Sequence, residues 1–235
     1  MPHRPAGPDP ASPDPADVAQ IAHAEMRHGS RPPVPMRCLE RPRIGGLVVP
    51  FISYVHGGAA IFGSVDPRRR TEALLRRLCQ ICGQRLDERV CLTVRPMDVR
   101  AGVATEPGLH PECLAYTVKA CPMFSGTATH YRTTPASIRH PAGRPCDDPA
   151  CPCPRIAPDE QHEIRSGRPA DDWDTWMIRA EHYRIEPDPK QPERLLGVDL
   201  DVPVLRVRPL RRAPRPRLDH AQAEQLRAAL RALGL

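Results

Sequence analysis

The sequence predicts an α+β protein built around a small treble-clef-like zinc module, with short strands and helices and flanking proline-rich segments of low order. Three observations support this fold class. Four residues of metal-ligand type occur as two close pairs, short β-branched runs alternate with helical patterns, and the chain has 31 prolines but only 4% aromatic residues. With so few aromatic side chains, a single large hydrophobic core is not expected.

The metal-ligand pairs are Cys79 with Cys82 and His110 with Cys113. Structural zinc takes four nitrogen or sulfur ligands in a tetrahedron, and both pairs have the spacing of such ligands. Gly83 follows the first pair directly, at a point where a Cys-x2-Cys knuckle needs a residue that turns tightly. The sequence therefore predicts one structural Zn²⁺ site with Cys79, Cys82, His110 and Cys113 as its ligands.

A redox pair and buried free thiols are the two other interpretations of these cysteines. A thioredoxin-type pair follows a strand and precedes a helix, whereas a helical pattern precedes Cys79 and a turn follows Cys82. Buried free cysteine is common, and we assign Cys91, in a predicted strand, to the core for this reason. Cys121 is interpreted either as a core residue or as a substitute ligand.

The elements expected before the first pair are an arm, short strands and a helix. Residues 1–35 are proline-rich and polar, which indicates a mostly disordered arm. Apolar residues at 44–54 predict one or two strands, in which Pro50 favours an edge or a break. An Asp-Pro dipeptide at 66–67 is typical of a helix start. This arginine-rich helix is expected over residues 67–78 and leads into the first pair.

A β-hairpin and a helix are expected to complete the zinc module. Residues 89–94 have a strand pattern, 101–105 can supply a return strand, and 96–100 are expected to form the turn. His110 and Pro111 begin a helix whose dipole favours an ionised Cys113 thiolate. A knuckle, a hairpin and a helix that carries the last two ligands are the layout of a treble clef.

The rest of the chain has weaker signals until its last helix. A strand is expected at 124–134, a weak helix at 173–185 and a strand at 195–207. Asp219 and Gln222 resemble a capping box, which predicts a terminal helix at 219–233. We divide the chain into four parts: a disordered arm (1–35), a zinc-stabilised α+β domain (36–135), a Cys/Pro-rich loop (136–172) and a C-terminal extension (173–235).

Residues 36–135 resemble a group of uncharacterised actinobacterial and phage proteins with a zinc-finger-like motif. The resemblance is carried by Leu-Cys-Gln-Ile-Cys-Gly at 78–83, by His-Pro-Glu-Cys at 110–113 and by Ala-Cys-Pro at 120–122. It implies the zinc site and no catalytic activity.

A second cysteine cluster lies in the loop at 136–172. Cys146, Cys151 and Cys153 could form another zinc set with His140 or His162. We favour an unstructured loop with incidental thiols, because no fourth ligand is specified by the pattern.

The net charge of +6 comes from 34 basic residues, nearly all of them arginines. This balance permits contact with nucleic acid. The expected surfaces are the arginine-rich helix 67–78 and the basic tract 206–217, where cations could bind phosphates. A solvated surface in a gene of GC-rich codons is the competing interpretation, and a protein partner is also possible.

No known catalytic motif is present in the sequence, so no catalytic residue is assigned. The expected function is a nucleic-acid or protein interaction module with a structural zinc. The alternative is a degenerate or unrecognised metal-dependent nuclease on the same scaffold. The N-terminus lacks the apolar segment of a signal peptide and no run is long enough for a membrane helix, so we expect a cytoplasmic protein without membrane contact.

Overall fold

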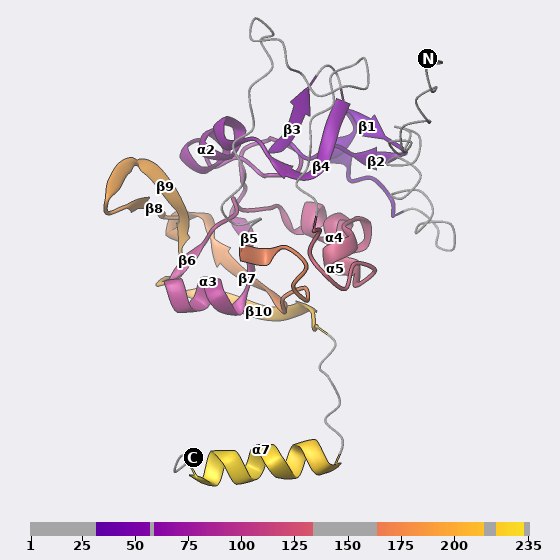
Figure 1. The fold of residues 1–235 in the computed structure, drawn as a ribbon. Helices are drawn as coiled ribbons and strands as arrows, with labels where there is room; N and C mark the ends of the chain where they lie inside the picture. The colour runs from indigo at the N-terminus through magenta and orange to yellow at the C-terminus, as the bar shows by residue number, and fades with distance from the viewer. Residues whose placement is uncertain (1–31, 57–58, 134–163, 214–219, 233–235) are drawn as a thin grey trace, which may run out of the picture.

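The computed structural model describes residues 32–56, 59–133, 164–213 and 220–232 (Figure 1). Most of the predicted arm and of the predicted Cys/Pro-rich loop lies outside these residues. Outside them also lie the second cysteine cluster, its two candidate histidines and Asp219. Within the described residues, helices and antiparallel strands are mixed, which confirms the α+β class. No helix there is both long enough and apolar enough to cross a lipid bilayer.

The elements are short throughout. The helices are η1 (Met36–Cys38), α2 (Pro67–Leu75), α3 (Pro96–Ala101), α4 (Pro111–Ala120), α5 (Pro122–Ser125), η2 (Ala180–His182) and α7 (His220–Ala232). The strands are β1 (Arg43–Ile44), β2 (Leu47–Val48), β3 (Ser53–His56), β4 (Ala59–Val65), β5 (Arg89–Val94), β6 (Val103–Ala104), β7 (Trp173–Arg179), β8 (Ile185–Asp188), β9 (Gln191–Asp199) and β10 (Val204–Arg211).

Two three-stranded antiparallel sheets join segments that are distant in the sequence. Strand β7 lies between β5 and β10, and strand β9 lies between β6 and β8. Each sheet therefore combines strands from before and after the loop at 136–172, as Figure 1 shows by their magenta and orange colours. The strands after residue 172 are integral to the fold that contains the predicted metal ligands.

The hairpin predicted between the two ligand pairs is wrong. Residues 96–101 form helix α3 in place of a turn, and β6 pairs with β9 while β5 pairs with β7. The local cause is a helix start that the prediction overlooked, with Pro96 in the first turn and the Asp98 carboxylate accepting from the Arg95 backbone N–H at 2.9 Å. Gly102 ends this helix in the left-handed conformation.

Two later predictions are also wrong, and one is confirmed. Residues 173–179 form strand β7, in which Trp173, Thr175 and Ile178 are buried, because pairing on both sides outweighs a weak local helical signal. The strand predicted at 124–134 is replaced by the short helix α5 and irregular chain. Helix α7 confirms the terminal helix within one residue of its predicted start.

Helix α2 ends three residues before the predicted limit, in a Schellman motif that turns the chain toward the first ligand pair. The N–H groups of Arg77 and Leu78 donate to the carbonyls of Leu74 and Ala73 at 3.2 and 2.8 Å. Arg77 has a φ of 53°, a left-handed conformation that is uncommon outside glycine. Leu78 packs with Ile52 and Ala73 in a small core of its own.

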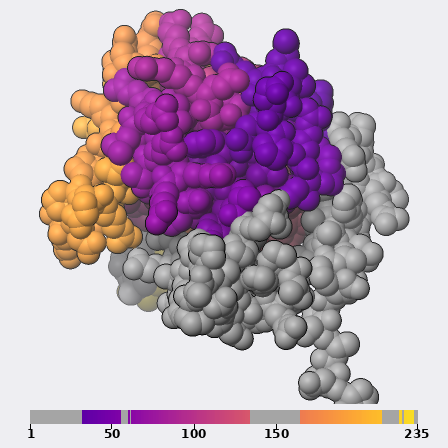
Figure 2. All heavy atoms as spheres, turned by 90° about the horizontal axis from the view of Figure 1, so that it is seen from above, coloured from indigo at the N-terminus to yellow at the C-terminus, as the bar shows by residue number. Residues whose placement is uncertain are grey.

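The main core surrounds the predicted metal ligands. Buried residues of β5, β7 and β9 pack with Leu109 and with side chains of α4, and Cys79, Cys82 and Cys113 belong to this same core. Figure 2 shows one face of this body, where the indigo segment that precedes α2 lies beside the magenta segment that follows it. The core is thus continuous from the sheets to the cysteines.

A buried ion pair closes the end of β5. Arg95 and Asp98 are each only 2% exposed, and the guanidinium donates to both carboxylate oxygens at 2.8 Å. Arg95 also donates to Thr105 Oγ1 at 3.0 Å and lies 5.1 Å from the centre of the Trp173 ring. Removing one member of such a pair leaves the other charge buried without its partner.

We predict that Asp98→Ala lowers the free energy of unfolding by about 3–5 kcal/mol, because Arg95 would remain buried and unpaired. Urea denaturation measures this loss. The matched control is Glu88→Ala, which removes an exposed carboxylate bonded to Arg179 at 3.0 Å and should cost less than about 1 kcal/mol. Equal costs for the two substitutions would contradict the assignment of Arg95 and Asp98 as a critical buried pair.

Candidate metal centre

The first ligand pair lies on a tight turn that follows α2. The Cys79 N–H donates to the Gln84 carbonyl at 2.8 Å, and the Gly83 N–H donates to the Cys79 carbonyl at 2.9 Å. A bridge between Leu78 and Arg85 closes the base of this turn. Gly83 has a φ of +75°, and a Cβ there would lie 2.6 Å from Cδ2 of Phe51. A knuckle of this shape therefore requires glycine at position 83.

The second pair is held against β5 by backbone hydrogen bonds. Leu109 exchanges two such bonds with Cys91, at 2.8 and 2.9 Å, and Gly108 accepts one from the Gln80 N–H at 3.1 Å. His110 is the N-cap of α4, and Cys113 lies in the first turn of this helix. The strand, the knuckle and the helix start are thereby fixed relative to one another.

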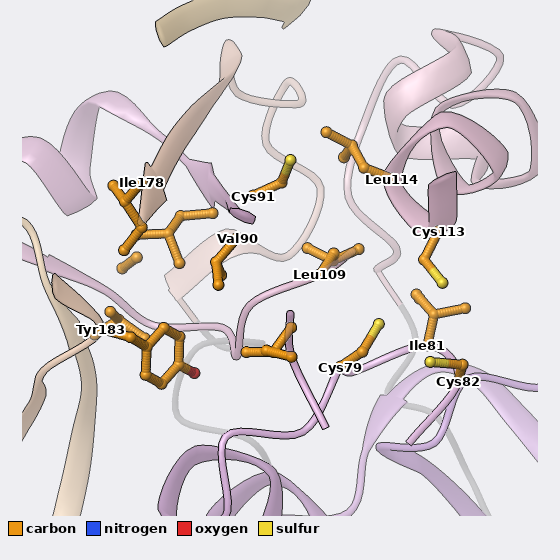
Figure 3. Close-up of a cluster of buried hydrophobic side chains, with 14 of the residues drawn as sticks. Cys79, Ile81, Cys82, Val90, Cys91, Leu109, Cys113, Leu114, Ile178 and Tyr183 are labelled. Carbon is orange, nitrogen blue, oxygen red and sulfur yellow. The ribbon is translucent and has the colours of Figure 1, made fainter. Parts of the chain in front are cut away.

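The four predicted ligands meet at one buried point. The Sγ atoms of the three cysteines and a ring nitrogen of His110 all lie within 4.8 Å of one another, and all four residues are buried. Tetrahedral zinc with Zn–S bonds of about 2.3 Å requires ligand atoms about 3.8 Å apart. Figure 3 shows Cys79, Cys82 and Cys113 pointing toward one another beside Ile81, while Cys91 points elsewhere. The cluster has the donor types and the dimensions of a metal-binding site.

The imidazole of His110 is oriented by its second nitrogen. Nδ1 lies 3.4 Å from the Cys82 Sγ, and Nε2 lies 3.0 Å from the backbone carbonyl oxygen of Arg85. A carbonyl only accepts, so Nε2 carries the proton and donates to it. Nδ1 is then the nitrogen that faces the three sulfur atoms. Metal-binding histidines are commonly oriented by such a hydrogen bond to a backbone carbonyl.

Hydrogen bonds within the cluster shift the pKa values of its members in opposite directions. Burial alone would lower the pKa of His110, but its hydrogen bonds to Cys79 and Cys82 raise that pKa to about 10. Hydrogen bonds from Cys113 and Cys79 hold the pKa of the Cys82 thiol far below its usual range. Hydrogen bonds to Cys38, Cys79 and Cys82 instead raise the pKa of the Cys113 thiol, opposite to the effect expected from the helix dipole. A metal ion bound here would displace the protons that remain on its thiol and imidazole ligands.

Two residues of the cluster's surroundings were missed by sequence reasoning. Cys38, in η1, is fully buried with its Sγ 4.0 Å from the Cys113 Sγ. The neighbouring Arg37 forms ion pairs with Asp87 and, at 2.5 Å, with Glu112, and so ties η1 to both ligand-bearing segments. No spacing rule reveals Cys38, because it precedes the knuckle by about forty residues.

The other cysteines that the structure describes lie outside the cluster. Cys91 is a buried core residue, as predicted. Cys121 lies between α4 and α5, half-buried, and is not a member of the four-donor group, so its interpretation as a substitute ligand is not supported. Among the described residues, this group is the one set of histidine, cysteine and acidic side chains that could hold a metal ion.

Comparisons with known proteins return no match. No protein-family model, no curated protein and no solved structure is significantly similar to this chain.

We predict that Gly83→Ala lowers the free energy of unfolding by about 2–3 kcal/mol. Alanine would have to adopt a left-handed backbone conformation and would contact the Phe51 ring. Thermal or urea denaturation measures the loss. The matched control is Gly126→Ala, which shares a left-handed φ of +83° but has no atom within 4 Å of the added Cβ. If both variants lose the same stability, the close approach of Phe51 does not constrain the knuckle.

Proposed function

We propose that Cys79, Cys82, His110 and Cys113 hold one structural Zn²⁺ ion in a treble-clef-like arrangement of knuckle and helix start. The buried group of three thiols and one imidazole within 4.8 Å is the observation that carries this proposal. Thiolate and imidazole donors favour zinc over magnesium or calcium, which prefer oxygen. The hydrogen bond from His110 Nε2 to Arg85 supports it as well, since it leaves Nδ1 to bind the metal.

Such a metal would stabilise the fold and would not itself take part in a reaction. Four protein ligands complete a tetrahedron, so no coordination position remains for water or substrate. A buried location among core residues favours the same role. We therefore propose that the protein is a zinc-stabilised binding module, with nucleic acid as its partner. The net charge of +6 supports a polyanionic partner.

The arginines of the predicted surfaces do not contribute equally to such binding. In α2, Arg70 donates to the carbonyls of Thr105, Leu195 and Leu196, so it joins the helix to β9. Arg69 likewise donates to the carbonyls of Phe51 and Ser53. In the tract 206–217, Arg206 and Arg208 are exposed, and residues 214–217 lie outside the described part. The exposed arginines are the better candidates for phosphate contacts.

The first test is the metal content of the purified protein. We expect about one zinc per chain by elemental analysis. The Cys82→Ser variant should lose both the zinc and cooperative folding, because a structural zinc site contributes on the order of 10 kcal/mol to folding. Cys91→Ser and Cys38→Ser replace buried cysteines outside the four-donor group and should each retain about one zinc per chain. Metal-free wild-type protein with an unchanged melting curve would disprove the structural zinc.

The second test is the salt dependence of nucleic-acid binding. We expect the full chain to bind labelled DNA or RNA at low salt, with an affinity that falls linearly on a plot of log affinity against log salt concentration. Fluorescence anisotropy measures the affinity at each salt concentration and hence the slope of this plot. Lack of binding at low salt to single-stranded and duplex probes would remove nucleic acid as the partner and leave the zinc proposal standing.

A further inference from the structure

Exposed arginines from three strands gather on one face of the β5–β7–β10 sheet. Arg89 is paired with Arg179, Arg206 with Met177 and Arg208 with Thr175. Directly opposed residues in antiparallel strands project from the same face, and Met177 and Thr175 share the face of Arg179 by their even spacing along β7. We call this set the arginine face; it comprises Arg89, Arg179, Arg206 and Arg208.

A surface pocket lies on the arginine face. Its volume is about 310 Å³, and its lining comprises Glu88, Arg89, Met177, Arg179, Leu205 and Arg206. Arg179 donates to the Glu88 carboxylate at 3.0 Å, and both side chains are largely exposed. Three cations and one carboxylate leave this pocket with net positive charge, beside the apolar surface of Met177 and Leu205.

Two of the pocket's arginines have no partner within the described part of the chain. The guanidinium groups of Arg89 and Arg206 form no hydrogen bond or ion pair with any residue that the structure describes. Arg89 also lies directly opposite Arg179, and like charges at opposed positions in a sheet are destabilising. Arg70, Arg95 and Arg212, by contrast, are bonded to carbonyls or carboxylates. A bound anion would relieve this repulsion.

We propose that the arginine face is the nucleic-acid-binding surface, with phosphodiester groups bound by Arg89, Arg179 and Arg206 at the pocket and by Arg208 beside it. This inference rests on the proposed function and locates the binding surface on the β5–β7–β10 sheet. Residues two apart on a strand lie about 7 Å from each other and neighbouring strands about 4.8 Å apart. The cations are therefore spread over a patch, which suits the repeated charges of a phosphate backbone better than a single small anion.

The composition of the face favours binding without base specificity. Its polar groups are guanidinium groups, which bind phosphate oxygens in bidentate fashion. No aromatic side chain lines the pocket, so the stacking platform used by many single-strand binders is missing at this place. The structure therefore assigns the face to backbone contacts, which carry affinity and salt dependence but no sequence information.

Glu88 opposes phosphate binding at this surface. Its carboxylate bonds to Arg179, so part of that cation's charge is neutralised before any ligand arrives. Removing the charge by Glu88→Gln would free the guanidinium for a phosphate. Substitutions at this face should thus change affinity in both directions, with Arg206 and Glu88 acting oppositely.

The experiment measures binding of a fluorescein-labelled DNA oligonucleotide, single-stranded and as a duplex, by anisotropy across a potassium chloride series. The test variants are the double substitution Arg89→Ala with Arg206→Ala and the single substitution Glu88→Gln. The matched controls are Arg68→Ala with Arg76→Ala, which removes two exposed cations from α2 and its C-cap, and Glu186→Gln on β8. Melting curves verify that each variant is folded.

We expect the Arg89/Arg206 variant to bind several-fold more weakly and to lower the magnitude of the log–log salt slope by about 2, one for each lost phosphate contact. Glu88→Gln should bind several-fold more tightly, and both control variants should remain close to wild type.

Four results would overturn the proposal. Wild-type binding that the Arg89/Arg206 variant leaves unchanged places the nucleic acid elsewhere and leaves the proposed function intact. Equal losses in the Arg89/Arg206 and Arg68/Arg76 variants show that binding follows net charge and not this face. Displacement of the labelled DNA by polyglutamate at equal charge concentration assigns the face to acidic polypeptides. If no probe binds wild-type protein at low salt, the proposed nucleic-acid function fails as well.

Discussion

Cys79, Cys82, His110 and Cys113 converge on one buried point, and the short elements around it are arranged by this convergence. The four donors come from a turn and from a helix start, and a backbone hydrogen bond from the Gln80 N–H to the Gly108 carbonyl joins the two segments at 3.1 Å. The first segment follows α2, which Arg70 joins to β9. The second is paired with β5, the strand that joins the metal centre to the main sheet. The donors therefore lie where several short elements meet, none of which is long enough to be stable alone.

Arginine has two different roles in this protein. Arg95 and Arg211 are buried and Arg70 is partly buried, and their guanidinium groups bond to backbone carbonyls or to a buried carboxylate. Their hydrogen bonds join short elements to one another in a chain that is poor in aromatic residues. Arg206 and Arg208 are exposed on an edge strand. Net charge alone does not separate these roles, because buried and exposed guanidinium groups contribute equally to it.

Strand β5 connects the candidate metal centre to the arginine face. Its third residue, Cys91, pairs with Leu109, which precedes the candidate ligand His110. Its first residue, Arg89, lies at the pocket on the arginine face. Within β5 only this first residue is exposed, so the strand is packed on both sides along the rest of its length. If the cluster holds the proposed metal, its loss would release the segment at Leu109 and weaken the support of β5 on that side.

The α+β class, the four clustered donors, strand β5 and the terminal helix could all be predicted from the sequence. These follow from local chemistry: the spacing of thiolates and imidazole, β-branched runs, and caps such as Asp66, which accepts from the Arg68 N–H at 2.9 Å. The tertiary structure alone decided that β5 pairs with β7 in place of β6, and that Cys38 lies beside Cys113. It also decided which arginines are buried. Pairing across the loop at 136–172 depends on contacts between distant segments, and a local pattern does not specify them.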